Sequence, residues 1–79
     1  MLKLKIVTPE KVVYDGNADN VTVPGTLGSF EILTDHAPIV SSLEPGNVKY
    51  SLSGKSQEIS ILGGFVEVRR NEVDVCVDI

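Results

Sequence analysis

The chain has 79 residues, of which 42% are hydrophobic, 5% aromatic and 23% charged. At this length folding buries roughly 60% of the surface that the unfolded chain exposes, so a second domain or a doubly wound nucleotide-binding sheet would need a longer chain. We therefore expect one domain over residues 1–79, with its function on the surface. The formal net charge is −4, from 7 basic and 11 acidic residues. The scattered cations argue against nucleic-acid binding, which needs a basic face.

The cysteine content and the apolar runs bear on the compartment. Cys76 is the only cysteine and cannot form an internal disulfide, which favours a reducing compartment for so small a domain. No apolar run approaches the ~18 residues that a membrane span needs, and residues 1–5 do not resemble a signal peptide. We expect a soluble, intracellular protein with no direct membrane insertion.

The first half of the chain predicts short strands. Val, Ile and Thr supply 22 residues against 2 alanines, and branching at Cβ favours strands over helices. Residues 2–8 alternate leucine or isoleucine with lysine, which is typical of a half-buried strand, and Pro9 ends it. Asp15-Gly16 predicts a turn or bulge. Further short strands are predicted at residues 12–14, 21–23 and 27–33, before a loop at residues 34–38.

The second half predicts two hairpins. Residues 48–53 and 58–62 alternate around a turn at residues 53–55. Gly63-Gly64 then allows a bend or bulge, and residues 65–79 predict a hairpin whose tight turn is Arg70-Asn71. The fold class that follows is all-β: an antiparallel β-sandwich or flattened barrel of roughly eight to ten short strands.

A lysine near a predicted turn raises two functional hypotheses. Gly54-Lys55-Ser56 resembles the end of a phosphate-binding loop, but the required glycine is replaced by Lys49, and a strand rather than a helix follows. We therefore interpret Lys55 as a solvated turn residue. A lipoyl or biotinyl carrier domain modified on Lys55 stays as the alternative function, although the flanking residues and the missing internal two-fold pattern speak against it.

The remaining reactive side chains do not form a catalytic or metal-binding pattern. A zinc site needs about three or four His or Cys ligands, whereas His36 and Cys76 are the only candidates. Cys76 alternates with valines and is expected on a sheet face, between Asp74 and Asp78 on the same solvated face. His36 is expected to hydrogen-bond the local backbone of its loop, where it could also contact a partner. We predict no enzyme activity, no cofactor, no metal and no small-molecule substrate.

Four motifs, in a fixed order along the chain, resemble those of a known protein family. The composition alone does not show this resemblance. Residues 23–46 read VPGTLGSFEILTDHAPIVSSLEPG, with a His-Ala-Pro triplet before a Pro-Gly pair. Residues 61–68 read ILGGFVEV, residues 71–75 read NEVDV, and residues 4–10 read LKIVTPE. Together they resemble the epsilon subunit of F-type ATP synthases over essentially the whole chain.

The resemblance implies a β-sandwich at the foot of the central stalk. Such a subunit would bind the gamma subunit and the ring of c subunits, turn with them as part of the rotor, and couple proton flow to ATP synthesis without catalysing a reaction. The implied location is peripheral, on the cytoplasmic face of the inner (plasma) membrane of a bacterium.

The resemblance also assigns surfaces residue by residue. The loop facing the c ring would include Gly28, Ser29, Phe30 and Glu31. The surface facing gamma would include Thr8, His36 and Ser41, with Ala37 and Pro38 fixing the loop that presents His36. Many relatives carry a carboxylate where this chain has Ser29. Typical relatives also continue into a helical hairpin that can restrain ATP hydrolysis, and because this sequence stops at Ile79, that activity is not expected here.

Overall fold

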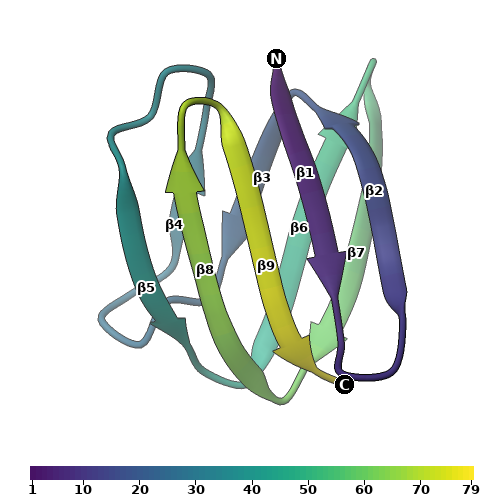
Figure 1. Cartoon of the computed structure of the whole chain (residues 1–79), viewed down its shortest axis with the longest axis vertical. Coiled ribbons are helices and arrows are strands. Elements are labelled where there is room, and N and C mark those ends of the chain that lie inside the picture. The colour runs from purple at the N-terminus through teal and green to yellow at the C-terminus, as the bar shows by residue number, and fades with distance from the viewer.

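The computed structural model describes all residues 1–79 and contains strands but no helix (Figure 1). The nine strands are β1 (Leu2–Val7), β2 (Val12–Ala18), β3 (Asn20–Val23), β4 (Phe30–Ile32), β5 (Ile39–Leu43), β6 (Gly46–Leu52), β7 (Lys55–Ile61), β8 (Gly63–Arg69) and β9 (Glu72–Asp78). The all-β prediction is confirmed, and the number of strands lies in the predicted range.

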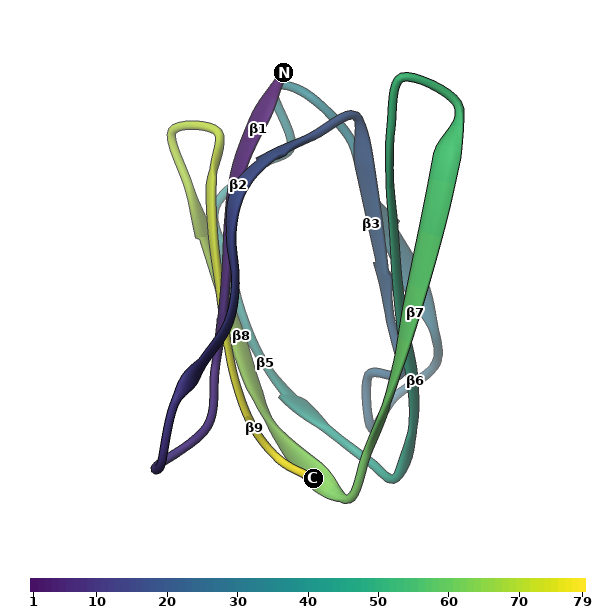
Figure 2. The same ribbon diagram turned by 90° about the vertical axis from the view of Figure 1, so that its right-hand side faces the viewer.

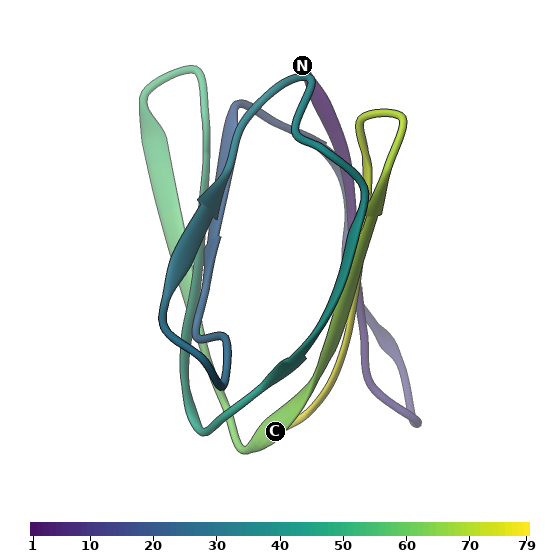
Figure 3. The same cartoon turned by 90° about the vertical axis from the view of Figure 1, so that its left-hand side faces the viewer.

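The strands form two sheets that face each other. One sheet has five strands in the order β2-β1-β9-β8-β5, and the other has four in the order β4-β3-β6-β7. Figures 2 and 3 show the two layers from opposite sides. The predicted β-sandwich is confirmed, with one exception to antiparallel pairing: β1 and β9 run parallel. A parallel pair needs a long crossover, and here the chain between the first and last strands supplies it.

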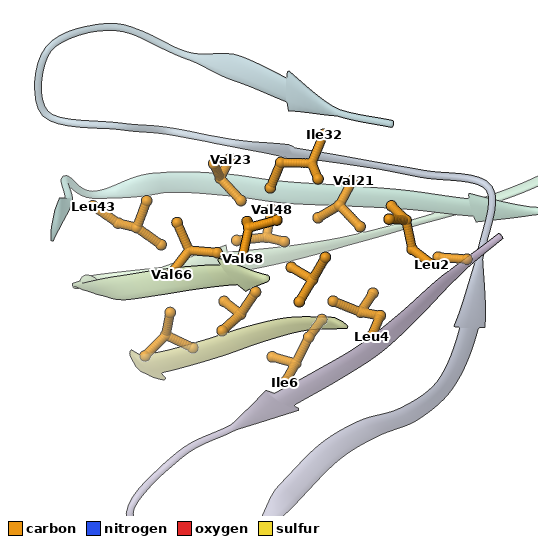
Figure 4. Packing of buried hydrophobic residues seen from close by; sticks show 14 of the residues in the cluster. Leu2, Leu4, Ile6, Val21, Val23, Ile32, Leu43, Val48, Val66 and Val68 are labelled. Atoms are coloured by element: carbon orange, nitrogen blue, oxygen red, sulfur yellow. The ribbon is translucent and has the colours of Figure 1, made fainter. Parts of the chain in front are cut away.

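The core lies between the two sheets and is entirely apolar. In β1 and β9 alternate side chains are buried, as the period-two pattern predicts. Figure 4 shows how aliphatic side chains from both sheets interdigitate. The buried residues are Leu2, Leu4, Ile6, Ala18, Val21, Val23, Ile32, Leu43, Val48, Ile61, Val66, Val68, Val73, Val75 and Val77. No polar or charged side chain is buried.

The predicted turn or bulge at Asp15-Gly16 is wrong, because β2 continues through both residues in regular register with β1. Gly16 pairs with Leu4 in the middle of the β1/β2 ladder. A Cβ at Gly16 would lie 3.0 Å from the Tyr14 hydroxyl oxygen, so the glycine makes room for the Tyr14 side chain. That hydroxyl donates to the carbonyl oxygen of Asn17 at 2.6 Å. The glycine therefore serves a close approach within the strand, not a reversal of the chain.

Several strands differ from the sequence prediction in length, and one was not predicted. β2 extends to Ala18 and β7 begins already at Lys55. Of residues 27–33 only the segment Phe30–Ile32 is a strand, since the preceding residues form a loop that is tied to β5. Strand β5 (Ile39–Leu43) was not anticipated, because its sequence has no clear alternation. It is the last strand of the five-stranded sheet, with β8 on one side and a single bridge from Leu43 to Gly25 on the other.

The predicted tight turns are confirmed in their backbone conformation. Arg70 and Asn71 have φ values of 49° and 63°, and Ser53 and Gly54 have 52° and 79°. Two successive residues with positive φ form the turn whose twist matches that of the flanking strands. Gly63-Gly64 begins β8 directly after a bend at Leu62, and both glycines pair with β9 in regular register, so the structure has a bend before the pair and no bulge in it. Gly64 has a φ of 145°, which L-residues rarely adopt.

The two open sides of the sandwich are bridged in different ways. Tyr14 of β2 and Tyr50 of β6 join the two sheets on one side, with ring centroids 4.6 Å apart. Burial raises the pKa of the Tyr50 hydroxyl, and the neighbouring Tyr14 adds to this shift. The opposite side, where β4 and β5 lie in separate layers (Figure 3), is bridged by loop residues described below.

We predict that core leucines and exposed leucines differ sharply in their contribution to stability. Leu4 of the central strand β1 is fully buried, so Leu4→Ala should reduce the free energy of unfolding by about 2–5 kcal/mol. Leu27 has a relative exposure of 103%, so Leu27→Ala is the matched control and should change it by less than about 0.5 kcal/mol. Urea unfolding of the two variants measures both values, and equal losses would contradict the placement of β1.

We also predict that Gly64 cannot be replaced. A Cβ there would collide with the carbonyl oxygen of Cys76 and with the Val77 backbone, and the φ of 145° is strained for any other residue. Gly64→Ala should therefore destabilise the fold by about 3 kcal/mol or more. The control is Gly54→Ala, which meets open space and should cost about 1 kcal/mol for its positive φ alone. Thermal unfolding of both variants measures the loss of stability. A smaller loss for Gly64→Ala than for Gly54→Ala would refute this account of β8.

Candidate functional surfaces

The loop that the sequence assigned to the c ring lies between β3 and β4 and is held to β5. The backbone N–H of Thr26 donates to the carbonyl oxygen of Ser42 at 3.1 Å, and the two side-chain hydroxyls are 2.8 Å apart. The backbone N–H of Gly28 donates to the carbonyl oxygen of Gly25 at 2.9 Å, which closes a turn with Leu27 at its exposed tip. These bonds give the loop one defined shape.

The four residues assigned to the ring are adjacent but not equivalent. Gly28, Ser29 and Glu31 are exposed, whereas Phe30 is half-buried and packs against the core. Gly25 cannot carry a side chain, since a Cβ there would lie 2.7 Å from the carbonyl oxygen of Gly28 and 2.9 Å from the Phe30 ring. Phe30 therefore anchors the loop, and its neighbours face the solvent.

His36 lies at the β4/β5 side of the sandwich, in the loop between these strands. Its backbone N–H donates to the carbonyl oxygen of Leu33 at 3.1 Å. Its Nδ1 lies 2.6 Å from the carbonyl oxygen of Ala37, which can only accept, so Nδ1–H is the donor. The predicted hydrogen bond to the local backbone is confirmed. The imidazole also faces Phe30, with the ring centroids 6.3 Å apart.

The structure brings together residues that the sequence had assigned to different partners. Phe30 was assigned to the ring and His36 to gamma, yet their rings are neighbours. Ser42 follows Ser41, assigned to gamma, and bonds Thr26 of the ring-facing loop. The β4/β5 side thus connects the two expected surfaces, which sequence patterns alone did not suggest.

Thr8, His36 and Ser41 do not form one cluster. Thr8 follows β1, and its hydroxyl donates to the carbonyl oxygen of Lys11 at 3.3 Å in a turn. His36 lies beyond the opposite end of the five-stranded sheet, next to the turn between β8 and β9. Ser41 pairs with the buried Val66 and so points to the inner face of β5, half-buried. An interface that includes all three would span the length of the sheet.

The outer faces of the two sheets differ in chemistry. On the five-stranded sheet, the aligned residues Ser42, Phe65, Cys76 and Val7 cross the outer face, with Val40 beside them. Phe65 is 47% exposed and Val40 is 70% exposed. A shallow pocket of about 350 Å³ at this row is lined by Thr8, Pro9, Phe65 and Cys76, among others. The sequence did not indicate a surface role for Phe65 or Val40: the alternation of residues 65–69 places Phe65 outward, whereas the segment with Val40 shows no clear alternation.

The outer face of the four-stranded sheet is polar and bonded within itself. The Asn47 side-chain amide donates to the Glu58 carboxylate at 2.6 Å and accepts from the Ser60 hydroxyl at 2.9 Å. The Ser51 hydroxyl likewise donates to the Asn20 side chain at 2.9 Å. These groups already bond one another, whereas the five-stranded sheet exposes apolar side chains, which makes its outer face the candidate surface for a partner.

The reactive side chains lie apart from one another. Cys76 is half-exposed on the outer face of β9, as predicted, and burial raises the pKa of its thiol, with Asp74 and Glu67 adding to the shift. No three His, Cys, Asp or Glu side chains lie close enough to hold a metal ion. Lys55 is exposed at the start of β7, beside the turn. No helix of the chain has the length and apolar character to cross a bilayer.

Comparison with solved structures gives the fold. A chain in the cryo-EM structure of the Euglena gracilis mitochondrial ATP synthase, described as OSCP/F1/c-ring in rotational state 1, superposes with a TM-score of 0.91 at 23% identity and covers 96% of this chain and 49% of that one. A chain in the Tetrahymena thermophila mitochondrial ATP synthase structure, described as central stalk/cring, superposes with a TM-score of 0.84 at 20% identity and covers 99% and 63%. At these identities the similarity concerns the fold.

Comparison of sequences gives the family. The ATP synthase epsilon chain of Carboxydothermus hydrogenoformans is 45% identical over 74 residues, covering 94% of this chain and 55% of the relative. That of Leptospira borgpetersenii is 40% identical over 77 residues, covering 98% and 61%. This chain thus spans little more than half the length of these relatives. The family model described as ATP synthase, Delta/Epsilon chain, beta-sandwich domain matches residues 1–79. The chain therefore belongs to the family of ATP synthase delta/epsilon chain β-sandwich domains.

Proposed function

We propose that this β-sandwich is a non-catalytic rotor element of an F-type ATP synthase that binds the gamma subunit and the c ring and couples proton flow to ATP synthesis. The observation that carries the proposal is the family match over all 79 residues, together with relatives that bear the name epsilon chain. The corresponding location is peripheral, at the cytoplasmic face of the inner membrane. No restraint on ATP hydrolysis is assigned to these residues.

The construction of the domain suits the transmission of torque. A rotor element must pass on force without deforming, and a close-packed core with cross-strand hydrogen bonds has low internal mobility. Thirty-nine backbone hydrogen bonds lie within the strands, and the fifteen core residues come from both sheets. The sandwich thus offers two external surfaces on one stiff body.

The two proposed surfaces are the ones that the family resemblance implies, and exposure and shape support them. The loop with Gly28, Ser29 and Glu31 is the proposed contact with the c ring, because it is exposed and held in one shape through Thr26 and Phe30. The proposed contact with gamma runs from Thr8, which lines the pocket beside Phe65, across the five-stranded sheet toward His36. Ala37 and Pro38 shape the loop of His36, and Ser41 lies on the strand between these ends.

The carrier hypothesis is disfavoured. Lys55 is exposed beside a turn, as a modified lysine must be, but the family match covers the residues around it without interruption. Intact-mass measurement of the protein from its native cell discriminates the two functions, since a lipoyl or biotinyl group on Lys55 would add mass to the unmodified chain.

We predict that reversing the charge of Glu31 weakens binding to the c ring, whereas reversing the charge of Lys55 does not. Glu31→Lys should weaken binding of the full chain to a complex of gamma and c ring from the same organism by about fivefold, which corresponds to about 1 kcal/mol for a charge at the rim of an interface. Lys55→Glu is the matched control, because Lys55 is equally exposed but lies in the β6/β7 hairpin. Biolayer interferometry at two salt concentrations measures both, and equal effects would count against the assigned surface.

We predict that Cys76 is a poor nucleophile. A raised pKa means that less of the thiol is ionised at a given pH, so alkylation by iodoacetamide should be slower in the folded chain than in urea at pH 8. The difference should shrink once the pH exceeds the pKa of the folded state. The midpoint of the rate against pH is the measurement, and a midpoint below that of the unfolded chain would show an activated thiol and reopen an enzymatic role.

A further inference from the structure

Two loops that are distant in sequence are joined by a reciprocal pair of hydrogen bonds. The backbone N–H of Asp35 donates to Oδ1 of Asn71 at 2.6 Å, and Nδ2 of Asn71 donates to Oδ1 of Asp35 at 3.2 Å. Asp35 belongs to the loop between β4 and β5, whereas Asn71 belongs to the turn between β8 and β9 (Figure 1). We call this pair the Asp35/Asn71 clamp.

Asn71 presents its amide from a fixed point. Its φ of 63° and that of Arg70, 49°, define the two-residue turn that ends β8 and starts β9. Its carbonyl oxygen accepts the backbone N–H of Lys3 at 2.8 Å, which ties the turn to the start of β1. Strands β8, β9 and β1 thus fix the position of the Asn71 backbone. The Asn71 side chain in turn holds the loop between β4 and β5.

The loop needs such support at Asp35. Its φ is 66°, a left-handed conformation that is costly for residues other than glycine and is tolerated best by Asn and Asp. Such a conformation persists where the surroundings impose it, and here the clamp bonds both the backbone N–H and the side chain of Asp35.

The direction of the chain at Asp35 decides where the next residue points. The backbone N–H of His36 reaches the carbonyl oxygen of Leu33, and its imidazole lies between Ala37 and the Phe30 ring. A change of φ at Asp35 would swing the following residues away from both contacts. The residues that contact His36 itself, namely Phe30, Leu33 and Ala37, are all close to it in the sequence.

We infer that Asn71 is the positioning residue for His36. It acts through Asp35: the clamp sets the left-handed conformation that directs the imidazole to the β4/β5 side of the sandwich. The inference rests on the proposed function only for its consequence, namely that Asn71 sets the affinity for gamma without being required to touch that subunit.

The test variant is Asn71→Gly, which removes the amide but keeps a residue that adopts positive φ freely. The matched control is Arg70→Gly, at the adjacent turn position with positive φ, whose exposed side chain makes no hydrogen bond to the loop. Asp35→Asn is the conservative variant, because it retains the backbone N–H, a side-chain Oδ1 acceptor and tolerance of the left-handed conformation.

Amide hydrogen exchange of the full chain, measured by NMR, reports whether the Asp35/Asn71 clamp is formed and needs no binding partner. In Asn71→Gly the amides of Asp35 and His36 should exchange at least tenfold faster than in the parent chain. In Arg70→Gly and Asp35→Asn they should stay within twofold, and the core amides of β9 should stay protected in all variants. Equal exchange in Asn71→Gly and Arg70→Gly would overturn the inference, as would loss of core protection specific to Asn71→Gly.

Affinity for the gamma subunit then separates this inference from the proposed function. Asn71→Gly should raise the Kd for gamma about tenfold relative to Arg70→Gly. If exchange responds as expected while the two variants bind gamma equally, Asn71 still positions His36, and the assignment of His36 to the gamma surface is wrong.

Discussion

The pairing of the first strand with the last is the contact on which the rest of the structure depends. β1 and β9 lie side by side and parallel in the middle of the five-stranded sheet, with Leu4 opposite Val73 and Ile6 opposite Val75, all four fully buried. Without this pair the sheet would divide into the β1/β2 hairpin on one side and the three strands β9, β8 and β5 on the other. The strands from β2 to β8 lie in the sequence between these two paired strands. The pairing therefore holds the two ends of the chain together and makes the domain one mechanical unit.

This constraint explains why the functional surfaces can be placed on loops. The core is thin but wholly apolar, so no buried polar group competes with packing. Hydrogen bonds to well-ordered strands and turns hold the loops. Thr26 bonds Ser42 of β5, and the backbone N–H of Asp35 donates to Asn71 beside β9. Contact residues on such loops need little ordering when they bind, which reduces the entropic cost of association.

The β4/β5 side gives the proposed rotor element a short link between its two partners. The ring-facing loop and the loop of His36 meet there through Phe30, while Thr26 bonds the strand that carries Ser41. The opposite side is bridged by the tyrosine pair of β2 and β6, and of the assigned residues only Thr8, in the turn between β1 and β2, lies toward it. The sandwich is therefore asymmetric: most of the proposed contact residues gather at one open side, and the tyrosine pair joins the sheets at the other.

Much of this protein was predictable from its sequence because local chemistry dictated it. The alternation of residues 2–7 and 72–78, the turns at Arg70-Asn71 and Ser53-Gly54, the all-β class and the family motifs are properties of adjacent residues. Only the tertiary structure decided what depends on distant neighbours: the parallel β1/β9 pair, the straight path of β2 at Gly16, and the edge strand β5. The bond from Asn71 to Asp35 belongs to the same class. A pattern of period two reports which face a residue occupies but not which strand lies beside it, since pairing is set by burial of the whole core.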